Sequence, residues 1–246
     1  AEPGETMSSS SYDAGIIMEV SGVEEAVYLL GDLRSKAPAV LKTSVNATAR
    51  ETRKLMIAQA KARYAVNAAG RRHLDDLKQR KKATNRSTSA ELYIAKMRND
   101  LGYFATSPRY PTHYTGKHWV EGPKVWKGKV LKESQMKPLP GGHREVYGKV
   151  SKAFLARFKS GHIGMVQRDI GSSSEHTVTA NGYPRWRNKK GQVEKLVTLG
   201  SPSATAMHNT VWPDVRPDAE EYLQNRLFEQ TERVLTRARA KQGLKL

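Results

Sequence analysis

Apolar side chains recur at helical spacing in two long segments of the chain. The first segment runs from about residue 38 to 64 and the second from about 217 to 242, and each opens on a proline, whose fixed φ suits the first turn of a helix. Their stripes are Leu41, Val45, Thr48, Thr52, Leu55 and Gln59 in the first segment, and Leu223, Leu227, Val234 and Ala238 in the second. The pattern predicts two long helices, the first with a stripe that is only weakly apolar in its middle.

Two shorter segments also have helical features. Residues 23–34 are rich in apolar residues at helical spacing. Residues 71–86 are strongly basic, and only Leu74 and Leu77 would face a core there. We predict a short helix in each segment.

Strand-forming residues fill much of the remaining chain. Short strands are predicted at 15–20 and 87–97, and the second is apolar on both faces, which is typical of a central strand. Alternation over 125–132 predicts an edge strand. Residues 99–122 have the composition of an irregular loop, and residues 171–192 that of an extended hairpin tip.

The clearest hairpin lies at about 152–168, with strands at 146–158 and 162–169. Apolar strand formers flank a Lys-Ser-Gly-His break: Phe154, Leu155 and Phe158 before it, and Ile163, Met165 and Val166 after it. Gly161 supplies the structural turn, because glycine adopts positive φ without steric cost. Helices and strands together predict an α+β fold, in which an antiparallel sheet with long hairpins is packed by two long helices.

The predicted organisation is a flexible arm followed by one domain. Residues 1–13 are small and polar, with none of the basic and apolar regions of a signal peptide, and are expected to form a flexible N-terminal arm. Residues 14–246 are expected to form a single domain, since 38% hydrophobic residues in a chain of 246 suffice for one core.

Charge changes the picture more than any motif does. Lys and Arg number 42 against 24 Asp and Glu, which gives a formal net charge of +18. Such a surplus sets up a positive field that attracts nucleic acid, anionic membranes or acidic protein surfaces. The chain has no cysteine, so disulfides and thiolate metal sites are excluded. It also lacks an apolar run of the length of about 18 residues that a transmembrane helix needs.

The cations are densest in residues 50–86, where twelve Lys and Arg residues accompany three acidic ones. A second basic block at 124–137 contains Trp126 and follows shortly after Trp119. Our candidates for facing nucleic acid are Arg71, Arg72, Lys78, Arg80, Lys81, Lys82, Arg86, Lys127 and Lys129. Such side chains neutralise phosphates and release counterions, although similar blocks often form only a solvated face. The tryptophans could stack on bases, but a buried anchor is the more common role.

No pattern of catalytic residues accompanies this charge. His113 and His118 are the closest histidine pair, with only Glu121 near them and no HExxH motif. Ser201 and Ser203 lack a surrounding GxSxG motif. The paired acids are explained by charge compensation or by a helix N-terminus: Asp75 with Asp76, and Glu220 with Glu221. We predict no catalytic residue, no metal site, no cofactor and no enzymatic activity.

Taken in order, these segments resemble the minor tail protein Z family of tailed bacteriophages and prophages. The specific part is the Phe-x-Ala-Arg-x-Lys-Ser-Gly-His pattern that begins at Phe154, and Gly200, Pro202 and Ser203 support it. The basic first helix and the strand at 90–97 precede these motifs in the expected order, and the resemblance covers about 40–235. The chain departs from the family in its longer N-terminal segment, in insertions at about 99–142 and 171–192, and in the missing aromatic residue before Gly200.

The resemblance implies a tail completion protein, related in fold to other head-tail joining proteins. Such a protein is a structural component of the virion tail or neck and is present in the host cytoplasm during assembly. The implied partners are further copies of the same chain, expected as a hexameric ring, with tail terminator or tail tube proteins and head-tail connector proteins. Genomic DNA passing through the channel would be contacted without sequence preference, and no membrane partner is implied.

Two other classes of function stay open. A sequence-independent nucleic-acid-binding protein outside a virion would need the same cations, and a monomer with tight, salt-sensitive DNA binding would favour it over a ring of defined stoichiometry. A nuclease would need carboxylates clustered around a divalent cation, and the acidic residues here are scattered.

Overall fold

The structure is a computed structural model that describes residues 15–19, 28, 30–94, 99–107, 109, 126–139, 145–146, 149–150, 153–158, 163–168, 175–178, 184–187 and 196–241. The chain packs as two compact units. The first unit contains residues 1–58, 76–97 and 204–246, and the second contains residues 59–75 and 98–203. The expectation that residues 14–246 form a single domain stays a prediction.

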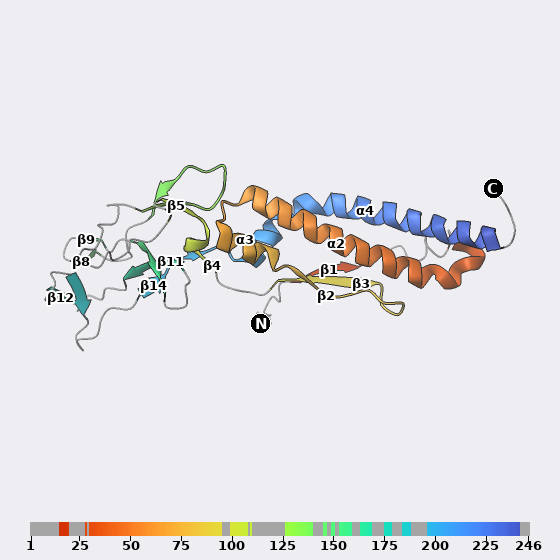
Figure 1. The fold of residues 1–246 in the computed structure, drawn as a ribbon, viewed down its shortest axis with the longest axis horizontal. Coiled ribbons are helices and arrows are strands. Elements are labelled where there is room, and N and C mark those ends of the chain that lie inside the picture. Colours follow the sequence, from red (N-terminus) through yellow and green to blue (C-terminus); the bar gives the residue numbers. More distant parts are fainter. Residues whose placement is uncertain are drawn as a thin grey trace, which may run out of the picture. The chain divides into compact units, whose positions relative to one another are not determined.

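Two long helices dominate the first unit. They are α2 (Ala37–Arg63) and α4 (Ala204–Lys241), and they lie side by side and antiparallel (Figure 1). The hydroxyl of Ser44, in the first third of α2, donates to the carbonyl of Arg226 at 3.2 Å and fixes α2 against α4 there. At the start of α2, a cluster joins the two helices through Leu30, Ala37 and Val40 with Leu33, Leu227 and Val234. The helix predicted at 38–64 is therefore confirmed.

The start of α4 was predicted too late. The helix begins at Ala204, so Pro213 and Pro217 lie inside it. Proline has no backbone N–H and is therefore favoured in the first turn of a helix, where that group has no partner. For this reason Pro217 indicated a helix start. Val211, Val215 and Ala219 are buried at a spacing of four, and their packing outweighs the local loss. The expectation that Glu220 and Glu221 lie at a helix N-terminus is wrong for the same reason.

A three-stranded antiparallel sheet packs on α2 in the first unit. Its strands are β1 (Gly15–Glu19), β3 (Ser89–Tyr93) and β2 (Lys78–Lys81), in that order, so the strand predicted at 87–97 is central as expected. Ala90 and Leu92 of β3 are buried. Gln79 of β2 pairs with Leu92, and its amide donates to the Asn46 side chain of α2 at 3.0 Å. The face that bears Leu92 therefore faces α2.

The helix predicted at 71–86 is wrong beyond its first turns. Helix α3 (Ala68–Asp75) belongs to the second unit, and the chain then continues as strand β2. The spacing of Leu74 and Leu77 suggested one helical face, but Lys-Gln-Arg-Lys contains no apolar residue to reveal a period of two. Of the helix predicted at 23–34, the described part from Gly31 onward is a 3-10 helix, η1 (Gly31–Lys36).

The stripe predicted for α2 is buried from Leu41 to Thr52 and polar in its middle, as expected, but Leu55 is only partly buried and Gln59 is exposed, so its C-terminal part is wrong. Ser44, Thr48 and Thr52 follow one another at a spacing of four and are almost fully buried. The hydroxyls of Thr48, Thr52 and, on α4, Thr231 have no hydrogen-bond partner. A buried hydroxyl without a partner costs about 1–3 kcal/mol, so these positions weaken the core of the unit.

The hairpin predicted at 152–168 forms in the second unit. Strand β10 (Phe154–Arg157) pairs with β11 (Ile163–Arg168), with Phe154 opposite Val166, and β11 also pairs with β14 (Leu196–Thr198). The turn at Gly161 lies outside the described residues. Buried Trp126, Ala153, Leu155 and Met165 form the core beside this sheet.

The other strands of the second unit are short. They are β4 (Asn99–Asp100), β5 (Ala105–Ser107), β6 (Lys127–Lys129), β7 (Lys137–Pro138), β8 (Glu145–Val146), β9 (Lys149–Val150), β12 (Glu175–Val178), β13 (Pro184–Arg187) and β15 (Gly200–Ser201). Strands β12 and β13 form a hairpin within the segment predicted to be one. Strand β6 lies between β5 and β7, so its prediction as an edge strand is wrong. The supposed irregular loop at 99–122 contains β4, β5 and the 3-10 helix η2 (Leu101–Tyr103).

The coarse fold class is therefore confirmed: helices combine with antiparallel strands in an α+β arrangement. A single sheet with long hairpins does not describe it. In the part of the chain that the structure describes, the strands form six small sheets of two or three strands each.

Asp100 joins three segments of the second unit. Its carboxylate accepts hydrogen bonds from the backbone N–H groups of Gly102 at 2.7 Å and Met165 at 2.8 Å, and it is 4% exposed. Its backbone pairs with Gly200 of β15. At Gly102 a Cβ atom would lie 2.7 Å from the carbonyl oxygen of Ile163, so only glycine allows this approach.

We expect Thr48→Val to raise the free energy of unfolding by about 1 kcal/mol, because it removes a buried hydroxyl that has no partner while keeping the shape of the side chain. The matched control is Thr43→Val on the same helix, where the exposed hydroxyl donates to the Ala39 carbonyl at 2.8 Å. Urea titration followed by circular dichroism measures both changes. Equal effects at Thr48 and Thr43 would show that burial of the hydroxyl is irrelevant.

We expect Asp100→Ala to destabilise the fold by about 2 kcal/mol or more, because two buried N–H groups lose their acceptor. Asp100→Asn keeps a carbonyl oxygen that can accept both bonds and should lose clearly less. Thermal unfolding of the two variants measures the difference. If both variants unfold at the same temperature, the acceptor role of Asp100 is refuted.

Candidate nucleic-acid interface

Strand β2 presents three cations on the outer face of the first unit's sheet. In the β2–β3 pairing Lys78 lies opposite Tyr93, and Lys81 lies opposite Glu91. The pairing shifts register between Gln79 and Lys81, so Arg80 is an extra residue in a bulge. Strict alternation would turn one of two successive side chains inward, whereas the bulge leaves both Arg80 and Lys81 exposed.

Two further cations follow in the loop between β2 and β3. Lys82 and Arg86 are exposed, while Ala83 between them is buried. The Asn46 side chain of α2 accepts from the Ala83 N–H at 3.0 Å and donates to the Ala83 carbonyl at 2.9 Å. The Thr84 hydroxyl accepts from the N–H groups of the two residues at the turn, Arg86 and Ser87. The loop backbone is thus fixed while its cations face solvent.

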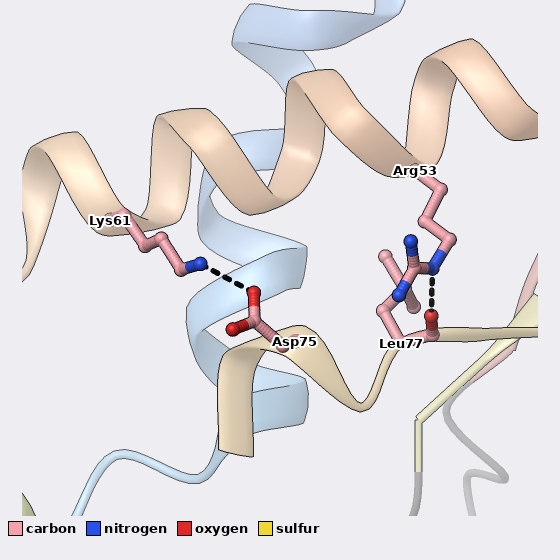
Figure 2. Close-up of polar contacts among 4 residues, drawn as sticks. All are labelled: Arg53, Lys61, Asp75 and Leu77. Carbon is pink, nitrogen blue, oxygen red and sulfur yellow. Dashed lines mark hydrogen bonds and ion pairs between the residues drawn. The ribbon is translucent and has the colours of Figure 1, made fainter. Parts of the chain in front are cut away.

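A basic side chain of α2 holds the start of β2. The guanidinium of Arg53 donates to the carbonyl of Leu77, immediately before the strand begins (Figure 2). Leu77 itself is 1% exposed. Asn46, Arg53 and the side chain of Gln79 therefore attach both ends of β2 to the same helix.

Acidic neighbours pair with part of this charge. The Lys78 ammonium lies 2.8 Å from an oxygen of Asp76. The Arg80 guanidinium lies 3.9 Å from an oxygen of Glu91 and 5.0 Å from the centre of the Tyr93 ring. The cations are well exposed, so solvent screens these contacts and they contribute little to stability.

The other cations of β2 and its loop have no such partner among the residues that the structure describes. Among the described residues, no ion pair involves Lys81, Lys82 or Arg86. We use the name hairpin group for the cations of β2 and its loop, which are Lys78, Arg80, Lys81, Lys82 and Arg86.

The second unit carries the other candidates. Arg71 and Arg72 are exposed on α3, whose first turn is capped by the Asn67 side chain accepting from the N–H groups of Ala69 and Gly70. The Asn67 amide also donates to the Gly102 carbonyl at 2.6 Å. Lys61 of α2 pairs with Asp75 at the end of α3 at 2.5 Å (Figure 2), as charge compensation predicted.

An aromatic contact fixes the position of α3. The ring of His73 lies 4.4 Å from that of Tyr103, centre to centre. Partial burial, and then the nearby charge of Asp100, raise the pKa of Tyr103 above its ordinary value. Its hydroxyl is therefore neutral at physiological pH.

Lys127 and Lys129 lie two residues apart on β6 and differ in accessibility. Lys127 is exposed, whereas Lys129 is partly buried and its ammonium donates to the Lys132 carbonyl at 2.6 Å. Trp126, which precedes them, is 5% exposed and belongs to the core, so it does not stack on bases. Trp119 lies outside the described residues.

The structure thus brings together five of the nine candidates, the hairpin group, and places the other four in the second unit. Sequence reasoning found the cations but missed the side chains that position them. Asn46 and Gln79 had no apolar pattern to mark them. The run Thr84-Asn85-Arg86-Ser87 did carry a signal, because such residues favour turns.

The described part of the chain contains neither a cluster of metal-ligating side chains nor a membrane-spanning helix. There, no three His, Asp or Glu side chains are grouped so that they could hold a metal ion. In the same residues, no helix has the length and apolar character needed to cross a membrane.

Comparison with known proteins adds no relative: no family model, curated protein or solved structure matches this chain.

We expect reversal of four exposed candidates, Arg71, Arg72, Lys81 and Lys82, to Glu to leave the fold intact. Exposed substitutions usually change stability by about 0.5 kcal/mol or less each. Far-ultraviolet circular dichroism and thermal unfolding test this. Leu74→Glu, at a residue that is 0% exposed, should abolish the cooperative transition under the same conditions. Loss of that transition in the fourfold variant would show that these cations are structural.

Proposed function

We propose that this protein is a structural subunit of a bacteriophage virion, a tail completion or neck protein without catalytic activity. Its copies form a ring at the head-proximal end of the tail, with a hexamer as the expected stoichiometry. The ring contributes to head-tail joining and to the passage of DNA. Its neighbours are tail terminator or tail tube proteins on one side and head-tail connector proteins on the other.

The observation that carries this proposal is the display of cations on fixed backbone. The hairpin group comprises five exposed cations on a strand and loop that side chains of α2 hold in place. Cations in this arrangement can contact phosphates without reading base edges. A protein that guides DNA through a channel needs this property and needs no reactive group.

The segments that carry the family resemblance also lie together. Strand β11 follows the Phe-x-Ala-Arg-x-Lys-Ser-Gly-His segment, and β14 precedes the Gly-Ser-Pro-Ser segment. Val166 of β11 pairs with Thr198 of β14, and the Leu199 N–H donates to the Met165 carbonyl at 2.8 Å. Motifs that pack as one element support the proposal of a fold related to head-tail joining proteins.

A ring gives the net charge of +18 a physical purpose. Copies around an axis would pool their cations against the phosphates of one duplex, and each contact would release counterions. Such binding is independent of sequence, as passage of a whole genome requires.

The second candidate function is sequence-independent nucleic-acid binding outside a virion. The hairpin group supports it equally, because phosphate contact does not require a ring. The assembly state of the protein separates the two candidates.

We expect the purified full-length protein to form rings of one stoichiometry in electron micrographs, with a matching mass by light scattering. Measurements at two salt concentrations control for charge repulsion between subunits. A monomer at all concentrations that binds DNA tightly would refute the ring and favour the second candidate. Plasmid incubated with the protein and Mg²⁺ should stay uncut, since cleavage would refute the structural role.

A further inference from the structure

We infer that the hairpin group is the surface on which the phosphate backbone of duplex nucleic acid docks, and that Asp76 and Glu91 set its affinity by neutralising part of its charge. This inference deepens the proposed function and rests on it, because both require nucleic acid at a cationic surface. It adds which surface makes the contact and which carboxylates tune it.

The density of charge matches a polyanion. Five cations lie within residues 78–86. A strand rises about 3.3 Å per residue, so Lys78 and Lys81, at the two ends of β2, are separated by roughly 10 Å. Duplex DNA carries one charge per about 1.7 Å of its axis, so that length of duplex offers about six phosphates. Several cations of the group can therefore contact phosphates at once.

The backbone beneath these cations is already ordered. Pairing with β3 holds one side of β2, and the Asn46 and Arg53 side chains hold its two ends. An ordered surface loses less conformational entropy on binding than a flexible basic tail does.

The hairpin group lacks the features of a membrane-binding or protein-binding surface. Among the described residues, the exposed large hydrophobic side chains are Tyr28, Leu131, Met136 and Phe228, and none belongs to β2, β3 or their loop. Membrane-surface segments insert apolar or aromatic side chains, and protein interfaces are centred on them. The Tyr93 ring of β3 lies beneath the Arg80 guanidinium, 5.0 Å from it. Charge alone remains, which favours the phosphate backbone.

The two carboxylates oppose docking. Glu91 lies opposite Lys81 and 3.9 Å from the Arg80 guanidinium, and Asp76 lies 2.8 Å from the Lys78 ammonium. A phosphate that approaches either cation meets the repulsion of the adjacent carboxylate and competes with it for the cation. At about 4 Å in water such an interaction changes a binding constant by about fivefold. Glu91 is thus a positioning residue, acting through Arg80.

The first test measures binding of the full-length protein to a labelled 30-base-pair duplex of random sequence by fluorescence anisotropy, between 50 and 200 mM salt. Lys81→Glu, Lys82→Glu and Arg86→Glu are combined in the hairpin variant. We expect a loss of affinity of about tenfold or more and a shallower dependence on salt, by about one unit of slope per lost contact.

A control variant changes the net charge by the same amount as the hairpin variant, at positions outside the hairpin group. It combines Lys42→Glu, Arg233→Glu and Arg237→Glu, all at exposed helical positions outside the hairpin group. We expect a change in its affinity of about threefold or less. Equal losses in the two variants would mean that only net charge matters, and no loss in the hairpin variant would place the contact elsewhere. Either result overturns the docking surface.

The second test concerns the carboxylates. Glu91→Gln should raise affinity about twofold to fivefold and steepen the salt dependence, because the repulsion between the Glu91 carboxylate and an approaching phosphate is removed. Glu232→Gln, at an exposed position of α4, removes the same charge away from the group and should leave affinity unchanged. Unchanged or weaker binding by Glu91→Gln would refute the tuning role.

Two further measurements distinguish the alternatives. If the wild-type protein sediments with vesicles of anionic lipid through the hairpin group but fails to bind duplex, the partner is a membrane and the inference is overturned. Electron microscopy of the same samples monitors the proposed function separately. Rings whose DNA affinity is the same in the wild-type protein and the hairpin variant would refute the inference alone. A monomer whose DNA binding is weakened in the hairpin variant would support the inference and refute the ring.

Discussion

The arrangement of the cationic surface depends on hydrogen bonds between α2 and a strand that has no apolar side chain of its own. Lys-Gln-Arg-Lys buries nothing that would hold it by the hydrophobic effect. Asn46 and Arg53 instead bond to the backbone at its two ends, and Gln79 reaches from the strand to Asn46. These hydrogen bonds use Asn46 and Arg53 of the helix and Gln79 of the strand. None of them involves a side chain of the hairpin group, so those cations stay exposed.

The helices and the central strand could be predicted because burial left a period in the sequence. The first part of the α2 stripe and the alternation of buried Ala90 and Leu92 in β3 are examples, as is the hairpin of β10 and β11. The errors occurred where burial and pattern diverge. Strand β2 is polar on both faces, and α4 continues through Pro213 and Pro217 because Val211 and Val215 are buried. For the surface, the cations were found from composition, but their grouping depends on Asn46 and on the bulge at Arg80, which no periodicity encodes.

The same edge strand meets a second requirement. An exposed edge can pair with another chain, and charged side chains with a bulge are the usual protection against this. Strand β2 is an edge of its sheet and carries both features. Protection of the edge explains the presence of charge on β2 but not its continuation to Lys82 and Arg86 beyond the strand. That continuation is the part of the pattern for which phosphate contact is the better explanation.

In the proposed ring, the cations that attract DNA also oppose assembly. Copies of a chain with a net charge of +18 repel one another, and salt at 0.1 M screens that repulsion only beyond a Debye length of about 10 Å. Asp76 and Glu91 reduce the charge of the hairpin group within that distance while leaving its cations exposed. A phosphate backbone would neutralise the rest, so the polyanion would stabilise the ring that surrounds it. In the proposed ring, the two carboxylates would therefore serve two requirements. They would lower the repulsion between the subunits, and they would leave enough positive charge in the hairpin group to attract DNA.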